Sequence, residues 1–210
     1  MKKALTAILT LCIFLPGIPA ADPGTAEKDA ALSLNILAVA HELGEGMFRD
    51  WTYGAYSRER RHLDCTTFIS AVIDTVLRRS GRSYTPEMRR DVLIAHPDLD
   101  RDVVRRGPDT ADPRYGGAAY AIEKYGAGTR IREMSQVLPG DIIQYWKQRR
   151  DGSWFGHASL IESLRYDAAA GVYRAKIFGS HKSTDGIAVS NFELHLSGED
   201  RVIYIARMGE

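Results

Sequence analysis

Apolar residues in the first half of the chain recur at the spacing of amphipathic helices. Residues 28–43 place apolar side chains three and four positions apart and precede two nearby glycines, which predicts a first helix. A second helix is expected directly after Asp64, whose carboxylate can cap free backbone N–H groups, and Gly81 suits its C-terminal end. Its apolar stripe comprises Phe68, Ile69, Val72, Ile73, Val76 and Leu77. Cys65 is therefore expected in the first turn of this helix.

The pattern then changes from helices to strands. Thr85-Pro86 predicts the start of a third helix and Pro97 its end. A charged, turn-rich stretch follows over 98–115, and a short helix is expected near 118–124. Beyond it lie segments rich in Ile, Val, Tyr and Phe: 129–132, 141–146, 157–165, 172–180 and 201–207. This order predicts an α+β domain, with N-terminal helices packed on one face of a C-terminal antiparallel sheet.

Length and composition favour one globular domain preceded by a processed segment. The 210 residues are 44% apolar and 26% charged, as in ordinary globular proteins. The chain begins with two lysines, an apolar stretch over 4–15, Pro16-Gly17 and small residues, the pattern of a secretory signal peptide. Cleavage is expected near Ala20 or Ala21, which gives a signal peptide over 1–20 and a domain over 21–210.

Removal of residues 1–20 changes both the charge and the cysteine content. It removes two lysines and no acidic residue, so the formal net charge of +1 becomes −1, which provides no attraction to nucleic acid. The apolar stretch is too short to span a bilayer, so we expect a secreted or periplasmic protein without a membrane span after cleavage. Cys12 is also lost, and Cys65 would be the only cysteine left, a candidate reactive thiol outside the cytoplasm.

A cysteine in the first turn of a helix suits nucleophilic chemistry. The helix dipole and the unpaired N–H groups stabilise a thiolate, so the pKa of Cys65 is expected to be lowered. The alternative is that Cys65 is a small buried apolar residue, the usual role of a cysteine.

His157 is a candidate base, because it stands at the start of a predicted strand, where its imidazole would be exposed at a sheet end. If Asp167 to Gly171 form the following hairpin loop, Tyr166 faces Val172. Counting back along both strands then places His157 opposite His181.

The same register makes two other favourable cross-strand pairs, Ile161 with Ile177 and Glu162 with Lys176. His181 can then hydrogen-bond one nitrogen of His157 and leave the other for Cys65, which gives a nucleophile, a base and an orienting residue. A bulge in the hairpin would break this alignment and leave Ser180 or Ser183 for the third position.

The other histidines are expected to be structural or solvated: His41, His62, His96 and His195. Of these, His62 is the one near enough to Cys65 in sequence to reach a cleft around it. The chain has no His-x-x-x-His, Cys-x-x-Cys or dense carboxylate cluster, so neither a metal nor a cofactor is expected.

Five segments carry short motifs around these residues. They are Trp51-Thr52-Tyr53-Gly54, Asp64-Cys65-Thr66-Thr67-Phe68, Leu138-Pro139-Gly140-Asp141-Ile142-Ile143, Gly156-His157-Ala158-Ser159-Leu160, and the stretch from Ser180-His181 to Gly186-Ile187. Together, and in this order, they resemble the NlpC family of papain-like cell-wall cysteine peptidases. Thr67 stands where that family has glycine. In this respect the segment around Cys65 is similar to the Cys-Thr-x-Phe-like segment of the related CHAP amidases. The resemblance covers most of residues 30–207.

The resemblance implies a papain-like fold and a catalytic set of Cys65, His157 and His181. The thiolate would attack an amide of a peptidoglycan stem peptide, and water would release the acyl-enzyme. The backbone N–H of Cys65 and the side chain of Tyr53 would bind the oxyanion, and Asp64 and Trp51 complete the oxyanion and substrate side of the site. Trp51 stands where the family usually has tyrosine, so it lacks that hydroxyl group.

The resemblance implies the peptidoglycan stem peptide as partner. An inhibitory protein is a further candidate partner, to which no residue points. A helical insertion over about 83–125 lengthens the separation between Cys65 and His157, as a lid, a selectivity wall or a partner surface. Two other functions stay open. One is a papain-like thiol acyltransferase or hydrolase acting on a lipid or protein, and the other is an inactive binding module of the same fold.

Overall fold

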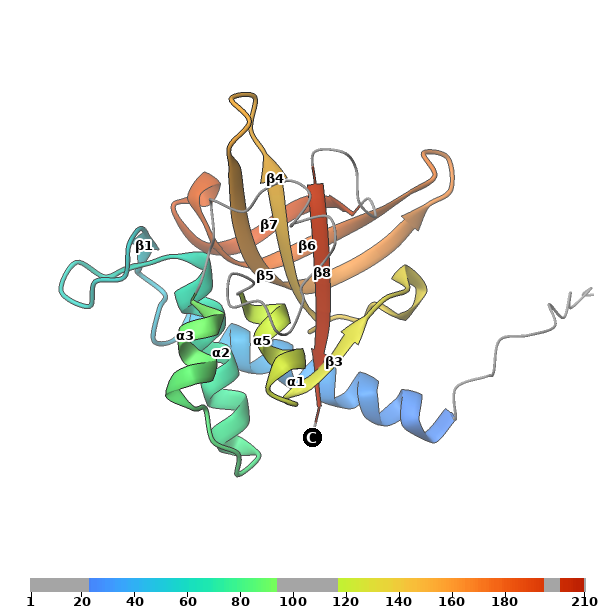
Figure 1. The fold of residues 1–210 in the computed structure, drawn as a ribbon, viewed down its shortest axis with the longest axis horizontal. Helices are drawn as coiled ribbons and strands as arrows, with labels where there is room; N and C mark the ends of the chain where they lie inside the picture. Colours follow the sequence, from blue (N-terminus) through green and yellow to red (C-terminus); the bar gives the residue numbers. More distant parts are fainter. Residues whose placement is uncertain (1–22, 94–116, 195–200, 210) are drawn as a thin grey trace, which may run out of the picture.

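A six-stranded antiparallel sheet with helices on one face forms the body of the protein (Figure 1). The computed structural model describes residues 23–93, 117–194 and 201–209. The helices are α1 (Pro23–Glu45), α2 (Cys65–Arg79), α3 (Pro86–Val92) and α5 (Ala118–Lys124). The predicted α+β class is confirmed. The signal peptide predicted over 1–20 and the charged stretch over 98–115 lie outside the described residues.

The sheet has the strand order β3-β8-β4-β5-β6-β7. Its strands are β3 (Gly128–Ile131), β4 (Ile142–Gln148), β5 (Trp154–Asp167), β6 (Val172–His181), β7 (Gly186–Leu194) and β8 (Arg201–Met208). A separate parallel pair consists of β1 (Thr52–Tyr53) and β2 (His62–Leu63), and two 3₁₀ turns are η1 (Met134–Gln136) and η2 (Lys182–Thr184). Within the described ranges, no helix is both long and apolar enough to cross a membrane.

Helix α2 forms because its sequence supplies both a cap and a continuous apolar stripe. The Asp64 carboxylate accepts a hydrogen bond from the Thr67 backbone N–H at 2.8 Å, and Gly81 has a φ of 73° just beyond the helix. All six residues of the predicted stripe are buried. This face packs against β5 and β6, so α2 is fixed against the strands that carry the candidate histidines.

Apolar clusters lie on both faces of the sheet. On the helix-covered face, Ile142, Leu160 and Phe178 join the main core with residues of α1, α2 and α5. A second cluster on the other face includes Ile143 and Ile177. Because neighbouring residues of a strand point to opposite faces, each central strand contributes to both clusters.

The turn before β4 depends on glycine and on a buried ion pair. Gly140 has a φ of 93°, and a Cβ atom there would lie 1.8 Å from the carbonyl oxygen of Ser33 in α1. The fully buried Asp141 accepts hydrogen bonds from the Leu138 N–H and from Arg207 of β8, each at 2.8 Å. The Pro-Gly-Asp turn therefore ties α1, β4 and β8 together.

The β5–β6 hairpin differs from the predicted one in two places. Asp167 pairs with Val172, so the connecting loop is shorter than predicted. Lys176 faces Ser163, and the predicted pair of Lys176 with Glu162 is therefore wrong. The physical reason is a β-bulge that leaves Glu162 without a partner in the ladder.

These two differences cancel where the candidate site begins. The shorter loop and the bulge each offset the register by one residue, so Ile161 faces Ile177 as predicted. Continued toward the end of the sheet, this register brings His157 and His181 side by side, and their ring centroids lie 4.9 Å apart. The bulge thus preserves the alignment that it was expected to break.

Several elements differ from the sequence prediction, including the short strands β1 and β2, which were not predicted. The third helix ends at Val92 instead of Pro97, which lies outside the described residues. Strand β7 was not predicted, because Ser190 and Asn191 interrupt its apolar pattern at the edge of the sheet. Helix α5, assigned to the insertion over 83–125, contributes five buried residues to the main core, so that part of the segment belongs to the body of the domain.

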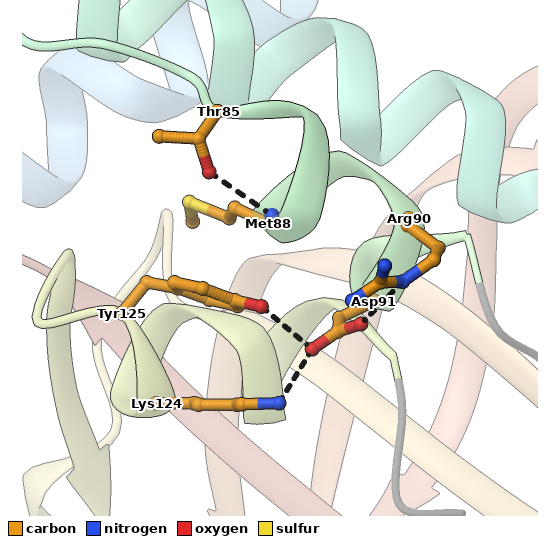
Figure 2. A network of polar contacts seen from close by, with 6 residues as sticks. All are labelled: Thr85, Met88, Arg90, Asp91, Lys124 and Tyr125. Carbon is orange, nitrogen blue, oxygen red and sulfur yellow. Dashed lines mark hydrogen bonds and ion pairs between the residues drawn. The ribbon is translucent and has the colours of Figure 1, made fainter. Parts of the chain in front are cut away.

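A buried carboxylate joins α3 to α5 (Figure 2). Asp91 accepts hydrogen bonds from Lys124 Nζ at 2.7 Å and from the Tyr125 hydroxyl at 2.9 Å, and Arg90 approaches at 3.4 Å. The backbone carbonyl of Asp91 also accepts from the Gly117 N–H at 2.7 Å. Asp91 therefore joins the two described segments that lie directly before and after residues 94–116 in the sequence.

Candidate active site

Cys65 lies in the first turn of α2, the helix that packs against strands β5 and β6 of the sheet. Its thiol is not in a disulfide within the described residues, and the residue is 6% exposed. The preceding Asp64 also accepts a hydrogen bond from the Thr66 hydroxyl at 2.9 Å, so its carboxylate acts as the helix cap. The backbone N–H groups of Ala158 and Thr66 lie close enough to lower the pKa of the thiol.

The two candidate histidines contact each other directly. His157 Nε2 lies 2.9 Å from His181 Nδ1 and 2.9 Å from the Ser159 hydroxyl. Ser159 is fully buried and was not proposed from the sequence, although its position two residues after His157 puts it on the same strand face. Both contacts of the His157 imidazole, with His181 and with Ser159, are therefore made by the same ring nitrogen, Nε2.

This arrangement leaves the other nitrogen of His157 for a reactant. Among the described residues, no hydrogen bond engages His157 Nδ1, and none joins the Cys65 thiol to the imidazole. If Nε2–H of His157 donates to His181 Nδ1, then Nδ1 of His157 carries a lone pair and can accept a proton. In this tautomer the proton of His181 lies on Nε2, which is buried and has no hydrogen-bond partner among the described residues.

Burial dominates the electrostatics of the site. It raises the pKa of Cys65 to about 11, with a further increase from the Asp64 carboxylate, and the backbone N–H groups do not compensate. The expectation of a lowered pKa is therefore wrong. Burial, with His181 nearby, lowers the pKa of His157 to about 3, and burial also lowers the pKa of His181. The resting site holds a neutral thiol and neutral imidazoles.

A cleft of about 390 Å³ opens in front of the histidine pair. Its lining includes Tyr53, Tyr145, His157 and His181, but not Cys65, which is buried. Burial and the nearby Cys65 raise the pKa of both tyrosines to about 12, so their hydroxyl groups stay protonated as donors. Tyr145 was not proposed from the sequence, because only the β4–β5 pairing places it opposite His157.

Trp51 lies away from the cleft lining. Its indole packs edge-on to Phe48 at 5.1 Å and stacks with Tyr56 at 6.0 Å. Its carbonyl oxygen approaches Gly186 so closely that a Cβ atom there would lie 2.7 Å away. Trp51 therefore fixes the segment that carries Tyr53 against the start of β7.

The remaining candidates have structural contacts or border the cleft. Ser180 donates to the carbonyl oxygen of Leu63 at 2.9 Å, while Ser183 lines the cleft. His62 pairs with Thr52 in the small parallel sheet. His96 and His195 lie outside the described residues.

His41 has a structural role, as expected, because it links helix α1 to the sheet. It stacks on Phe178 at 4.2 Å and contacts the Glu162 carboxylate at 2.9 Å, so the bulged residue of β5 binds helix α1.

Comparison with protein-family models, with curated proteins and with solved structures found no match for this chain. Any assignment therefore rests on the site itself. The described residues contain no group of three or more histidine, cysteine or carboxylate side chains arranged to bind a metal ion.

The raised pKa of Cys65 predicts a steep pH dependence of its alkylation. Because only the thiolate reacts, the rate with iodoacetamide should rise about tenfold per pH unit from pH 7 to 10. The measurement is mass spectrometry of a Cys12→Ser protein, in which Cys65 alone reports. The same protein unfolded in urea should level off above about pH 9, and a folded profile already flat at pH 7 would refute the raised pKa.

Proposed function

We propose that this protein is a cysteine hydrolase that cleaves an amide bond in the peptide part of bacterial peptidoglycan. The observation that carries the proposal is the 2.9 Å contact between His157 Nε2 and His181 Nδ1, with Cys65 at the helix N-terminus beside the same strand. A helix-terminal thiol, a base and an orienting residue are the elements of thiol-dependent acyl transfer.

The proposed reaction begins from the neutral pair. The Cys65 thiol turns from the Ala158 amide toward Nδ1 of His157 and transfers its proton as sulfur attacks the amide carbonyl. The imidazolium then protonates the leaving amine, the C–N bond breaks, and a thioester remains on Cys65. Water, deprotonated by His157, hydrolyses this thioester and regenerates the thiol.

Oxyanion stabilisation would come from donors around Cys65. The backbone N–H of Cys65 lies at the positive end of α2, and the Tyr53 hydroxyl borders the cleft with its proton retained. The Asp64 carboxylate is already used in capping, so we assign it to orientation of the first turn instead of direct contact with substrate.

Three further features support the cell-wall assignment. The described architecture places helices before an antiparallel sheet, which is compatible with a papain-like fold. The order of Cys65, His157 and His181 along the chain resembles that of the NlpC family. The expected signal peptide would bring the enzyme and peptidoglycan into the same extracytoplasmic compartment.

The test is incubation of the protein with purified peptidoglycan under reducing conditions, with Cys65→Ala as the matched control. Mass spectrometry should detect soluble fragments with the wild type and none with the variant, and the fragment masses identify the bond. If neither protein releases fragments, the cell-wall hydrolase is wrong, and acyl transfer to a lipid or protein and simple binding become the functions to measure.

A further inference from the structure

The charge of the cleft in front of the histidine pair is one-sided. Thirteen described residues line it, of which Arg149 and Lys182 are cationic and none is acidic. The whole chain, in contrast, is nearly balanced, with 28 basic and 27 acidic residues. The cleft therefore differs from the average surface in a way that favours an anionic ligand.

Neither cation of the cleft forms an ion pair within the described part of the protein. Arg149 forms no ion pair there: it donates to the Ser153 hydroxyl at 3.3 Å and lies over the ring of Phe155 at 5.0 Å. Lys182 likewise has no ion-pair partner among the described residues. Such exposed cations remain available to a carboxylate of a ligand.

Three acidic residues near the site lie outside the cleft lining. Hydrogen bonds from Ser153 and, to a smaller extent, the nearby Arg149 lower the pKa of Asp151, so this carboxylate accompanies Arg149 without entering the cleft. Asp185 accepts a hydrogen bond from the backbone N–H of Tyr53 at 3.3 Å, and Asp64 caps α2. A ligand carboxylate in the cleft would therefore approach the two cations without an acidic lining residue beside it.

The two cations flank the candidate base. Arg149 directly follows β4, and Lys182 directly follows β6. Strand β5, which carries His157, lies between these two strands, and all three meet the same end of the antiparallel sheet. A substrate lying across His157 would therefore pass a cation on each side.

We propose that the cleft selects amide substrates that carry carboxylates near the scissile bond, and that Arg149 and Lys182 bind those carboxylates. The inference rests on the proposed hydrolase function and specifies its substrate class as an acidic peptide. Both residues bind substrate without taking part in bond cleavage, so their loss should weaken binding more than turnover.

A binding experiment tests this without requiring turnover. The Cys65→Ala protein is titrated calorimetrically with a stem tetrapeptide that has free carboxylates and with its fully amidated counterpart. The free acid should bind about 10-fold more tightly or better, because charge-assisted hydrogen bonds are the stronger class. Adding Arg149→Gln and Lys182→Gln together should remove the difference, whereas Arg150→Gln, at a neighbouring residue outside the cleft lining, should preserve it.

The outcomes separate this proposal from the hydrolase function. Equal affinity for the two peptides, no binding of either, or a preference that survives the double substitution would overturn the anionic subsite. If fragments are still released from peptidoglycan in a cysteine-dependent manner, the hydrolase function stands while the subsite falls. If the protein prefers free carboxylates but releases no fragments, the anionic subsite stands and the hydrolase function falls.

Discussion

Replacing His157 with glutamine should lower the rate of peptidoglycan cleavage by about 10²–10⁴-fold, the usual contribution of a general base. Glutamine can fill the space near His181 and Ser159, but its amide cannot accept the thiol proton. Because burial holds the Cys65 thiol protonated, with a pKa of about 11, the nucleophile has no other described route to its reactive form. The measurement is the initial rate of fragment release at pH 7.

A matched pair at the neighbouring position distinguishes orientation from packing. His181→Asn keeps an acceptor near the position of Nδ1, whereas His181→Leu has similar volume without one. We expect the asparagine variant to retain more activity than the leucine variant, and both to exceed His157→Gln. Thermal unfolding of each variant controls for folding. Equal rates for asparagine and leucine would show that the contact with His157 does not orient the base.

Asp91→Asn should lower the free energy of unfolding by about 2–3 kcal/mol. Removing one partner of a buried ion pair leaves the other charge uncompensated, and the 28% exposure of the Lys124 side chain places the expected loss below the range for fully buried pairs. The amide retains the size of the carboxylate and an acceptor for Tyr125. A shift of the urea midpoint with an unchanged slope is the expected signature.

Two controls identify the cause of that loss. Arg90→Gln should change stability by less than about 0.5 kcal/mol, because the Arg90 side chain is 68% exposed and its contact is long. Burial raises the pKa of Asp91, but hydrogen bonds from Lys124 and Tyr125 outweigh it and lower the pKa overall. The difference in the free energy of unfolding between the wild type and Asp91→Asn is therefore fully present above about pH 4 and declines as the pH falls further. A constant difference down to pH 2 would contradict this account.

Local signals predicted the helices well, because each depended on adjacent residues. The cap, stripe and terminal glycine of α2 all lie within one short segment, and all three have the predicted roles. Strand β7 lacks such a signal: the apolar Val189 is exposed and the polar Ser190 is half-buried, so the sequence does not alternate with exposure, and only pairing with β6 defines the strand. Edge strands of this kind depend on a partner that periodicity does not reveal.

The sequence predicted that the two candidate histidines lie side by side, but it did not predict how deeply the candidate residues are buried. The pairing of His157 with His181 followed from a register with two compensating errors, which sequence counting could not detect. The shift in the pKa of Cys65 has the opposite sign from the prediction, because a helix N-terminus is visible in sequence while the depth of burial is not. Ser159 and Tyr145 emerged only once strands were paired.

Because Glu162 lies in a bulge, strand β5 could be one residue shorter without changing the alignment of His157 with His181. On either side of it the ladder resumes with Ile161 opposite Ile177 and Ser163 opposite Lys176. Excision of this one residue would close the ladder without rotating any neighbour to the other face, since those partners already occupy consecutive rungs. What would disappear is the carboxylate that holds His41 of α1. Glu162 is thus a position of β5 that attaches helix α1 and can vary without changing the alignment of His157 with His181.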